Sequence, residues 1–161
     1  MPARNFKPWL WFAGVIVLLD QIGKWIALGA LREGDSLYFA PFWNWVLAFN
    51  TGAAFSFLSG AGGWQRWFFT AFSLAVSVWI VALLRRYSGQ FRLSLALALI
   101  LGGALGNVVD RIRFGKVVDF IQWHIRWNGI DYAWPAFNLA DAAITAGVLL
   151  LLLDQAVGRR E

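Results

Sequence analysis

Residues 93–109, LSLALALILGGALGNVV, form an apolar run without one charged side chain. A helix needs about 20 mostly apolar residues to cross the hydrocarbon core of a bilayer. Three other stretches have a similar character: residues 9–31, 67–84 and 135–153. The sequence therefore predicts an all-α polytopic membrane protein with four spans in a single domain, residues 1–161. An even number of spans places both termini on the same side of the membrane.

The composition also indicates a membrane protein. Hydrophobic residues make up 60% and charged residues 14% of the chain, against about 45–50% and about 25% in soluble domains. The absence of Cys excludes a disulfide scaffold, a thiol nucleophile and cysteine-ligated zinc, and one His excludes a His-rich metal site. We expect no metal and no cofactor. The net charge of +5 does not indicate nucleic-acid binding, because the basic residues lie at the ends of the apolar runs.

The positions of the basic residues predict the orientation. Six Lys and Arg are spread over two long segments, residues 32–66 and 111–134, whereas seven crowd into short ones. The seven are Arg4, Lys7, Arg85, Arg86, Arg92, Arg159 and Arg160. By the positive-inside rule, both termini are cytoplasmic and the two long segments lie outside. A cleaved signal peptide is the less favoured alternative, because Asp20 and Lys24 interrupt the first apolar run.

The two outer segments carry an unusual share of the aromatic residues. Seven of the eleven Trp lie in or beside them: Trp43, Trp45, Trp64, Trp67, Trp123, Trp127 and Trp134. Trp prefers the headgroup level of a membrane, where one edge of the ring is apolar and the other wet. Residues 38–49 predict short strands broken at Pro41, and residues 60–63 a flexible, glycine-rich return. We expect a small, partly β element on the outer leaflet.

Polar groups inside the spans are candidates for function, because burying them in lipid costs several kcal/mol. Asp20 and Lys24 have the i, i+4 spacing of a helical ion pair, which we interpret first as mutual neutralisation and helix packing. Gly102 and Gly106 form a G-x-x-x-G motif, typical of close contact between helices. Asn107 fits either an interhelical hydrogen bond or an amide that faces substrate.

Two carboxylates deserve a chemical interpretation. Asp141 has no basic residue within a helical turn, and it lies roughly 9 Å below the outer end of a helix that begins at Pro135. Asp119 lies just beyond the outer end of the third span. Two carboxylates at one boundary cannot both ionise easily, so one keeps its proton. Such a pair can hydrolyse a peptide bond by acid–base catalysis without a metal or a covalent nucleophile.

Other interpretations stay open at this point. Asp119 could pair with Arg113 or Lys116 while Asp141 has an unspecified capping role, which would make the chain a membrane scaffold. A proton-coupled transporter would place its acid near the midplane and often shows repeat symmetry, and neither feature is evident. A Ser–His–Asp arrangement would need His124, but no Ser stands in a nucleophile turn.

Four blocks of sequence resemble lipoprotein signal peptidase, the bacterial signal peptidase II family. They are LDQIGK (residues 19–24), FNTGAAFSFL (49–58), GGALGNVVDRIRFGKVVDFI (102–121) and PAFNLADAAI (135–144). The blocks occur in order and fall on or beside all four spans, so the resemblance covers essentially the whole chain. Gly23 departs from the family, which often has a hydroxyl residue there.

The resemblance implies an aspartyl endopeptidase of the bacterial inner membrane, with its active site near the extracytoplasmic face. Its substrates would be prolipoproteins that carry diacylglycerol on a cysteine, cut just before that cysteine. Asp119 and Asp141 match the catalytic pair, and Asp20 and Lys24 match supporting positions. The residues that match positions lining or bracing the site are Asn50, Gly103, Asn107, Arg111 and Asn138. We expect a monomer in contact with membrane lipid.

Overall fold

The computed structural model describes residues 5–51 and 63–158. Within these ranges, four helices are long and apolar enough to cross a membrane. They are α1 (Lys7–Ala30), α2 (Trp64–Tyr87), α3 (Phe91–Phe114) and α4 (Leu139–Gly158). The four predicted spans are therefore confirmed, and every helix includes the core of the apolar run that predicted it.

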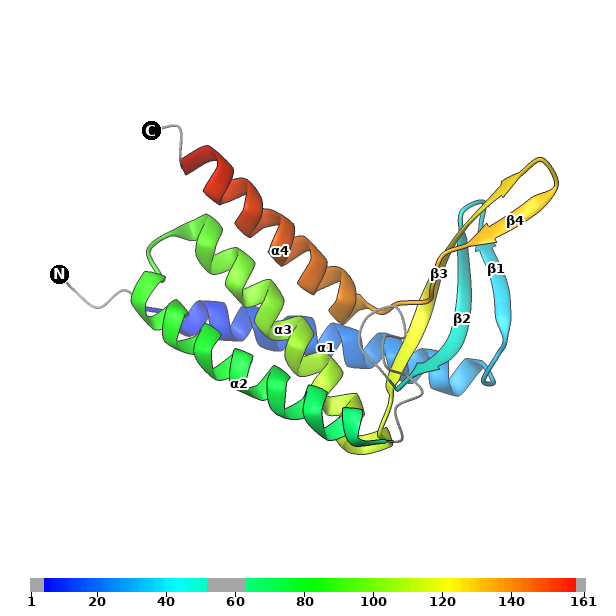
Figure 1. Ribbon diagram of the computed structural model, residues 1–161, viewed down its shortest axis with the longest axis horizontal. Helices are drawn as coiled ribbons and strands as arrows, with labels where there is room; N and C mark the ends of the chain where they lie inside the picture. Colours follow the sequence, from blue (N-terminus) through cyan, green and yellow to red (C-terminus); the bar gives the residue numbers. More distant parts are fainter. Residues whose placement is uncertain (1–4, 52–62, 159–161) are drawn as a thin grey trace.

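Helix α3 lies at the centre of the bundle and contacts the other three helices (Figure 1). Small residues make these contacts close. A Cβ atom on Gly102 would lie 2.7 Å from the Cβ of Ile16, and one on Gly103 would meet the carbonyl oxygen of Ala140. The packing role predicted for the G-x-x-x-G motif thus holds for α1, and the adjacent Gly103 serves α4 in the same way.

Both ends of the described chain lie at one end of the bundle, and a β-sheet lies at the other (Figure 1). The sheet has the order β1-β2-β3-β4, and every neighbouring pair is antiparallel. Its strands are β1 (Ser36–Ala40), β2 (Trp43–Asn50), β3 (Val117–Trp127) and β4 (Ile130–Ala133). The strands predicted on either side of Pro41 are confirmed, and β3 and β4 extend the sheet beyond that prediction.

The sheet is attached to the bundle at two places. Ala27 and Leu31, at the end of α1, pack against Leu47 of β2 and Val118 of β3. Phe137, just before α4, exchanges backbone hydrogen bonds of 2.9 Å with Ile121 of β3. These attachments hold the first residues of β3 between α1 and the start of α4.

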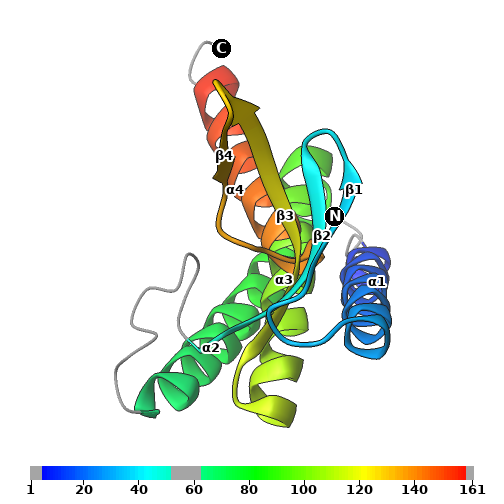
Figure 2. The same cartoon turned by 90° about the vertical axis from the view of Figure 1, so that its right-hand side faces the viewer.

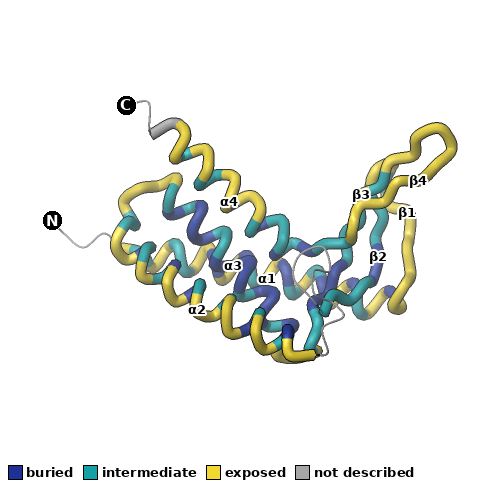
Figure 3. The backbone as a smooth tube through the Cα atoms, in the orientation of Figure 1, coloured by how far each residue is buried: buried dark blue, intermediate teal, exposed yellow. Residues whose placement is uncertain are grey.

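Strands β3 and β4 form a hairpin whose tip extends beyond strands β1 and β2 (Figure 2). Its turn is Asn128-Gly129, and both residues have positive φ, 48° and 78°. That conformation matches the tight turn whose twist suits a two-residue hairpin. The inner part of β3 is buried, whereas the hairpin is almost entirely exposed (Figure 3).

Two predicted boundaries were wrong. The third span does not end at Val109, because α3 continues to Phe114 and Gly115 ends it with φ +75°. Helix α4 does not begin at Pro135, because Phe137 is paired with β3 and α4 starts only at Leu139. Asp141 therefore lies in the first turn of α4 rather than about 9 Å below its end.

Other predictions about the outer segments fall on residues 52–62, which lie outside the described residues. They include most of the block at 49–58 and most of the glycine-rich return at 60–63. Gly63 itself is described, and with φ +96° it immediately precedes α2.

Candidate active site

Asp119 enters the site from the buried inner end of β3. Its side chain is only 3% exposed, and its Oδ1 accepts a 2.8 Å hydrogen bond from the amide nitrogen of Asn138. The alternative partners proposed from the sequence are occupied elsewhere: Lys116 lies 3.8 Å from Glu33, and Arg113 stacks over Trp25. The partner of Asp119 is thus a neutral amide rather than a cation.

Asp141 enters from the first turn of α4, where it forms a reciprocal cap with Asn138. The Asn138 side-chain oxygen accepts the backbone N–H of Asp141 at 2.9 Å, and the Asp141 carboxylate accepts that of Asn138 at 3.4 Å. This arrangement satisfies two N–H groups at the start of a helix. The capping role suggested for Asp141 is therefore present, at the start of α4, and the cap also places its carboxylate beside Asn138.

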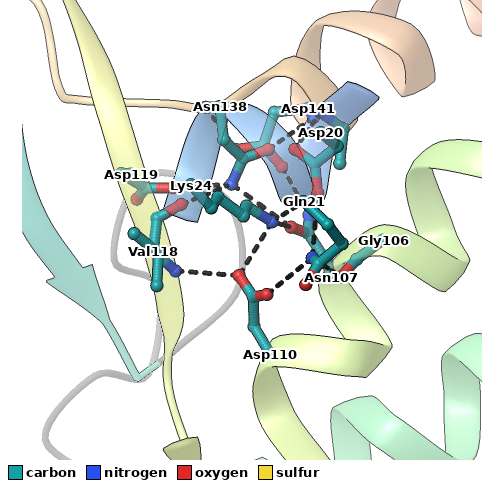
Figure 4. A network of polar contacts seen from close by, with 11 residues as sticks. Asp20, Gln21, Lys24, Gly106, Asn107, Asp110, Val118, Asp119, Asn138 and Asp141 are labelled. Carbon is teal, nitrogen blue, oxygen red and sulfur yellow. Dashed lines mark hydrogen bonds and ion pairs between the residues drawn. The ribbon is translucent and has the colours of Figure 1, made fainter. Parts of the chain in front are cut away.

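Two amides connect the carboxylates (Figure 4). The amide nitrogen of Asn107, on α3, donates to Asp141 at 2.8 Å, and its oxygen accepts from Asn138 at 3.2 Å. Asn138 in turn donates to Asp119. Of the two roles left open for Asn107, the structure shows the interhelical one.

A buried charge cluster lies directly behind these amides. Lys24 of α1 is 2.7 Å from Asp20 and 2.8 Å from Asp110, and it also donates to Asn107 at 3.0 Å. Lys24 and both carboxylates are at most 1% exposed. The predicted Asp20–Lys24 ion pair is present, but it is part of a larger network that reaches the amides between Asp119 and Asp141.

The cluster also fixes backbone near both carboxylates. Asp20 accepts the N–H of Ala140, in the first turn of α4, at 2.9 Å, and Asp110 accepts the N–H of Val118, the residue before Asp119, at 3.0 Å. An anionic side chain is favourable at a helix N-terminus, where the N–H groups have no intrahelical partner. The same three charged residues therefore anchor the elements that carry Asp119 and Asp141.

Asp110 and Gln21 are functional candidates that the sequence analysis missed. Gln21 donates to Asp110 at 2.8 Å and to the backbone oxygen of Gly106 at 3.2 Å. Asp110 was overlooked because the predicted span ended one residue earlier, at Val109, and the outer segment was taken to begin one residue later, at Arg111. Its position three residues after Asn107, on the same face of a helix, was the available signal.

The electrostatics of the site favour one retained proton. Burial, followed by repulsion from Asp141, raises the pKa of Asp119 from its ordinary value of 3.8 to about 8. Arg111, on α3, interacts electrostatically with Asp141, Asp110 and Asp119. At neutral pH the pair can therefore offer a protonated carboxyl and a carboxylate together, the combination that general acid–base catalysis needs.

The remaining predicted residues lie around this centre in different ways. Asn50 ends β2 opposite Val117, two pairs away from the Ala48–Asp119 pair. The Arg111 guanidinium lies 5.5 Å from the ring centre of Phe69 on α2. Gly103 contributes close packing between α3 and α4 rather than a chemical group. At Gly23, the departure from the family, a Cβ atom would lie 2.7 Å from the ring of Phe120, the residue after Asp119.

Four helices long and apolar enough to cross a membrane, with a buried pair of carboxyl groups at one end of the bundle, are the features of a polytopic membrane protein. The family model of signal peptidase (SPase) II matches residues 12–157. The chain belongs to this family of integral membrane proteases, which are aspartic peptidases.

Individual relatives agree with the family assignment. The chain is 53% identical to the lipoprotein signal peptidase of Ralstonia nicotianae over 92% of this chain and 83% of that protein. It is 50% identical to that of Cupriavidus pinatubonensis, over 94% and 85%. Two bacterial membrane enzymes solved by the in meso method share the fold, with TM-scores of 0.81 and 0.77 at 31% and 32% identity. The first covers 93% of this chain and 88% of its own, the second 92% of each.

Proposed function

We propose that this protein removes the signal peptide from diacylglyceryl-modified prolipoproteins, cutting just before the lipidated cysteine. The relatives' name, lipoprotein signal peptidase, supports lipoproteins as the substrate class, and the lipid modification and the position of the cut follow from the family resemblance. The observation that carries the mechanism is the pair of carboxylates, Asp119 and Asp141, that two amides hold together at the sheet end of the bundle.

In the proposed reaction the carboxylate of the pair takes a proton from water, and the water oxygen adds to the scissile carbonyl carbon. The protonated carboxyl gives its proton to the carbonyl oxygen, which produces a neutral tetrahedral intermediate. The first carboxyl then passes its proton to the leaving nitrogen, the second recovers one from a hydroxyl group, and the C–N bond breaks. The two carboxyls exchange roles within one turnover, so neither is consumed.

We place the pair near the extracytoplasmic face, with both termini in the cytoplasm. The crowding of Lys and Arg at the termini and at the α2–α3 connection supports this orientation. A substrate with a transmembrane signal helix and two acyl chains would approach through lipid, and water would reach its scissile bond near the interface. In this proposal Arg111, Asn50 and Asn138 hold backbone carbonyls of the substrate, and a monomeric single domain, residues 1–161, is sufficient.

The β3–β4 hairpin is the part of the sheet best suited to the proposed contact with the outer leaflet. Cross-strand pairing puts Ile125 with Tyr132 and Trp127 with Ile130, so these large side chains share one face. The other face carries Arg126 opposite Asp131. A hairpin with one face of large, mostly apolar side chains and one charged face suits a membrane interface. Trp43 and Trp45, by contrast, are half-buried in the sheet, so the lipid contact is assigned to the hairpin.

The test is to purify Asp119→Asn and Asp141→Asn and offer each a diacylglyceryl-modified prolipoprotein. Because each variant lacks one of the two proton-transfer groups, we expect a folded protein with no measurable cleavage. Asp154→Asn is the matched control, since it makes the same change near the opposite end of α4 and should cleave normally. Cleavage by either site variant, or its loss in the control, would contradict the proposal.

A further inference from the structure

The orientation of the two central amides decides what each carboxylate receives, and Lys24 constrains that orientation. An ammonium group has three donors and no acceptor. The ammonium group of Lys24 contacts Asp20, Asp110 and the side chain of Asn107. The atom of Asn107 that faces Lys24 must therefore be the oxygen, and its NH₂ group then points to Asp141.

The orientation of Asn138 is fixed separately, by backbone. Its oxygen accepts the N–H of Asp141, and its nitrogen donates to the carbonyl of Val118 at 3.2 Å. The nitrogen has two hydrogens but three acceptors within reach, and the shortest contact, 2.8 Å, goes to Asp119. The Asn107 side-chain oxygen therefore accepts from two groups, Asn138 at 3.2 Å and Lys24 at 3.0 Å. Lys24 constrains the orientation of Asn107 more strongly, because its donor is charged.

The two carboxylates consequently receive different numbers of donors. Both oxygens of Asp141 accept hydrogen bonds, from Asn107 at 2.8 Å and from the backbone of Asn138 at 3.4 Å. For Asp119, the contacts found among the described residues involve Oδ1 alone. Hydrogen bonds to both oxygens favour the ionised form, whereas an oxygen without a donor has room for a proton.

We infer that Lys24 is a positioning residue that assigns the catalytic roles: by orienting Asn107 it makes Asp141 the ionised base and leaves Asp119 the protonated acid. The inference rests on the proposed function and goes beyond it, because the carboxyl pair alone is symmetric. The buried position of Asp119 and its raised pKa agree with the assignment.

The charged surroundings allow Lys24 to act in this way. Asp20 faces it from α1 and Asp110 from α3, and Asp119 of β3 and Asp141 of α4 lie within electrostatic range. Arg111 of α3 interacts with Asp110, Asp119 and Asp141. Two carboxylates around one ammonium give the cluster a net charge of −1 and hold the ammonium in place. Removing Lys24 alone would leave two buried carboxylates uncompensated and risk unfolding.

Infrared spectroscopy at pH 6 tests the position of the proton. A protonated carboxyl has a carbonyl stretching band distinct from the bands of a carboxylate. We expect the protonated-carboxyl band that comes from Asp119 and Asp141 to vanish in Asp119→Asn and to remain in Asp141→Asn. The reverse pattern would overturn the inference even if both variants were inactive, whereas cleavage by either variant would overturn the proposed function itself.

Kinetics test the part played by Lys24. The double variant Lys24→Met/Asp110→Asn keeps the net charge of the cluster at −1 and retains an oxygen that can accept the N–H of Val118. We expect kcat to fall about 100-fold with KM nearly unchanged, and the low-pH limb of activity to move to higher pH, because Asp141 loses its oriented donor.

Lys116→Met/Glu33→Gln is the matched control, since it removes a half-exposed Lys–carboxylate pair outside the site. Its kcat and pH profile should match those of the unmodified protein. Lower yield of folded Lys24→Met/Asp110→Asn protein with an unmoved low-pH limb would reduce Lys24 to a structural role and overturn the inference.

Discussion

The two ends of β3 have opposite environments. At the inner end, Val117–Asp119 is buried, and Asp119 bonds to an amide. At the outer end, the hairpin is exposed, and Asp131 bonds to His124 and Arg126 at 3.1 and 3.2 Å. Burial raises the pKa of Asp119, whereas the hydrogen bond from His124 lowers that of Asp131. The same residue type is thus kept neutral at one end and charged at the other.

Under the function proposed above, the inner end of β3 gives up stability for the sake of catalysis. A buried carboxyl that keeps its proton makes folding less favourable as the pH rises, because the same group ionises freely in the unfolded chain. Burial also keeps a proton available at neutral pH, where an exposed carboxyl would have lost it to water. The outer hairpin loses no stability in this way, because Asp131 and Arg126 are exposed to solvent. Its apolar side chains are also exposed and can contact lipid.

The largest effect concerns stability against pH. The pKa of Asp119 is raised in the folded state, so its contribution is fully present below the unfolded pKa of about 4 and is lost as pH rises through about 8. The slope can reach about 1.4 kcal/mol per pH unit between these values. We expect Asp119→Asn to raise the melting temperature in detergent at pH 8 and to change it little at pH 4.

Asp131→Asn, in β4 opposite the outer end of β3, is the matched comparison. The lowered pKa of Asp131 means that its small contribution is present at neutral pH and lost as pH falls. This variant should therefore be slightly less stable at pH 7 and unchanged at low pH. Equal pH dependence in Asp119→Asn and Asp131→Asn would remove the contrast between the two ends of β3.

The second effect concerns the packing that places Asp141. In Gly103→Ala the new methyl group would meet the carbonyl oxygen of Ala140 and lie 2.7 Å from Ile144. Because backbone cannot yield as a flexible side chain does, we expect a loss of about 1–3 kcal/mol of stability. Cleavage should fall at least about tenfold as α4 moves away.

Gly14→Ala is the control for this substitution. Gly14 lies inside α1, and nothing is within 4 Å of a Cβ built there. Alanine should be neutral or gain up to about 1 kcal/mol from its higher helix propensity. Thermal unfolding and cleavage measured side by side check both variants, and an equal loss in both would show that close packing is not the reason.

The smallest effect concerns the apolar face of the hairpin. Trp127→Ser/Ile130→Ser should slow cleavage a few-fold in lipid vesicles but not in detergent, because only a bilayer offers an interface to that face. Arg126→Ser/Asp131→Ser changes the polar face of the same hairpin and should cleave at the normal rate in both media. A loss of the same size for both pairs would argue against a lipid contact.

Local sequence patterns predicted several features correctly. The four spans follow from the length of apolar runs, and the Asp20–Lys24 pair follows from one helical turn of spacing. The Asn128-Gly129 turn could also have been predicted, since this dipeptide between alternating apolar residues is a strong hairpin signal. Each of these depends on residues close together in the chain.

The boundaries failed where distant segments compete with local preference. Pro135 suits the first turn of a helix, but pairing of Phe137 with β3 delays α4 until Asn138 can cap it. Asp110, next to the predicted end of the third span, was overlooked because its partners, Lys24 and Val118, come from other elements. Hydropathy alone contains no information about such partners.

Four membrane spans and two carboxylates of functional interest can be predicted from the sequence, because hydrophobic length and the cost of polar groups in lipid are local quantities. The two oriented amides that Asp119 and Asp141 share depend on tertiary packing. The hydrogen bond between Asp20 and the backbone of Ala140 spans 120 positions. Contacts of that range arise when helices pack, and they turn isolated charges into one site.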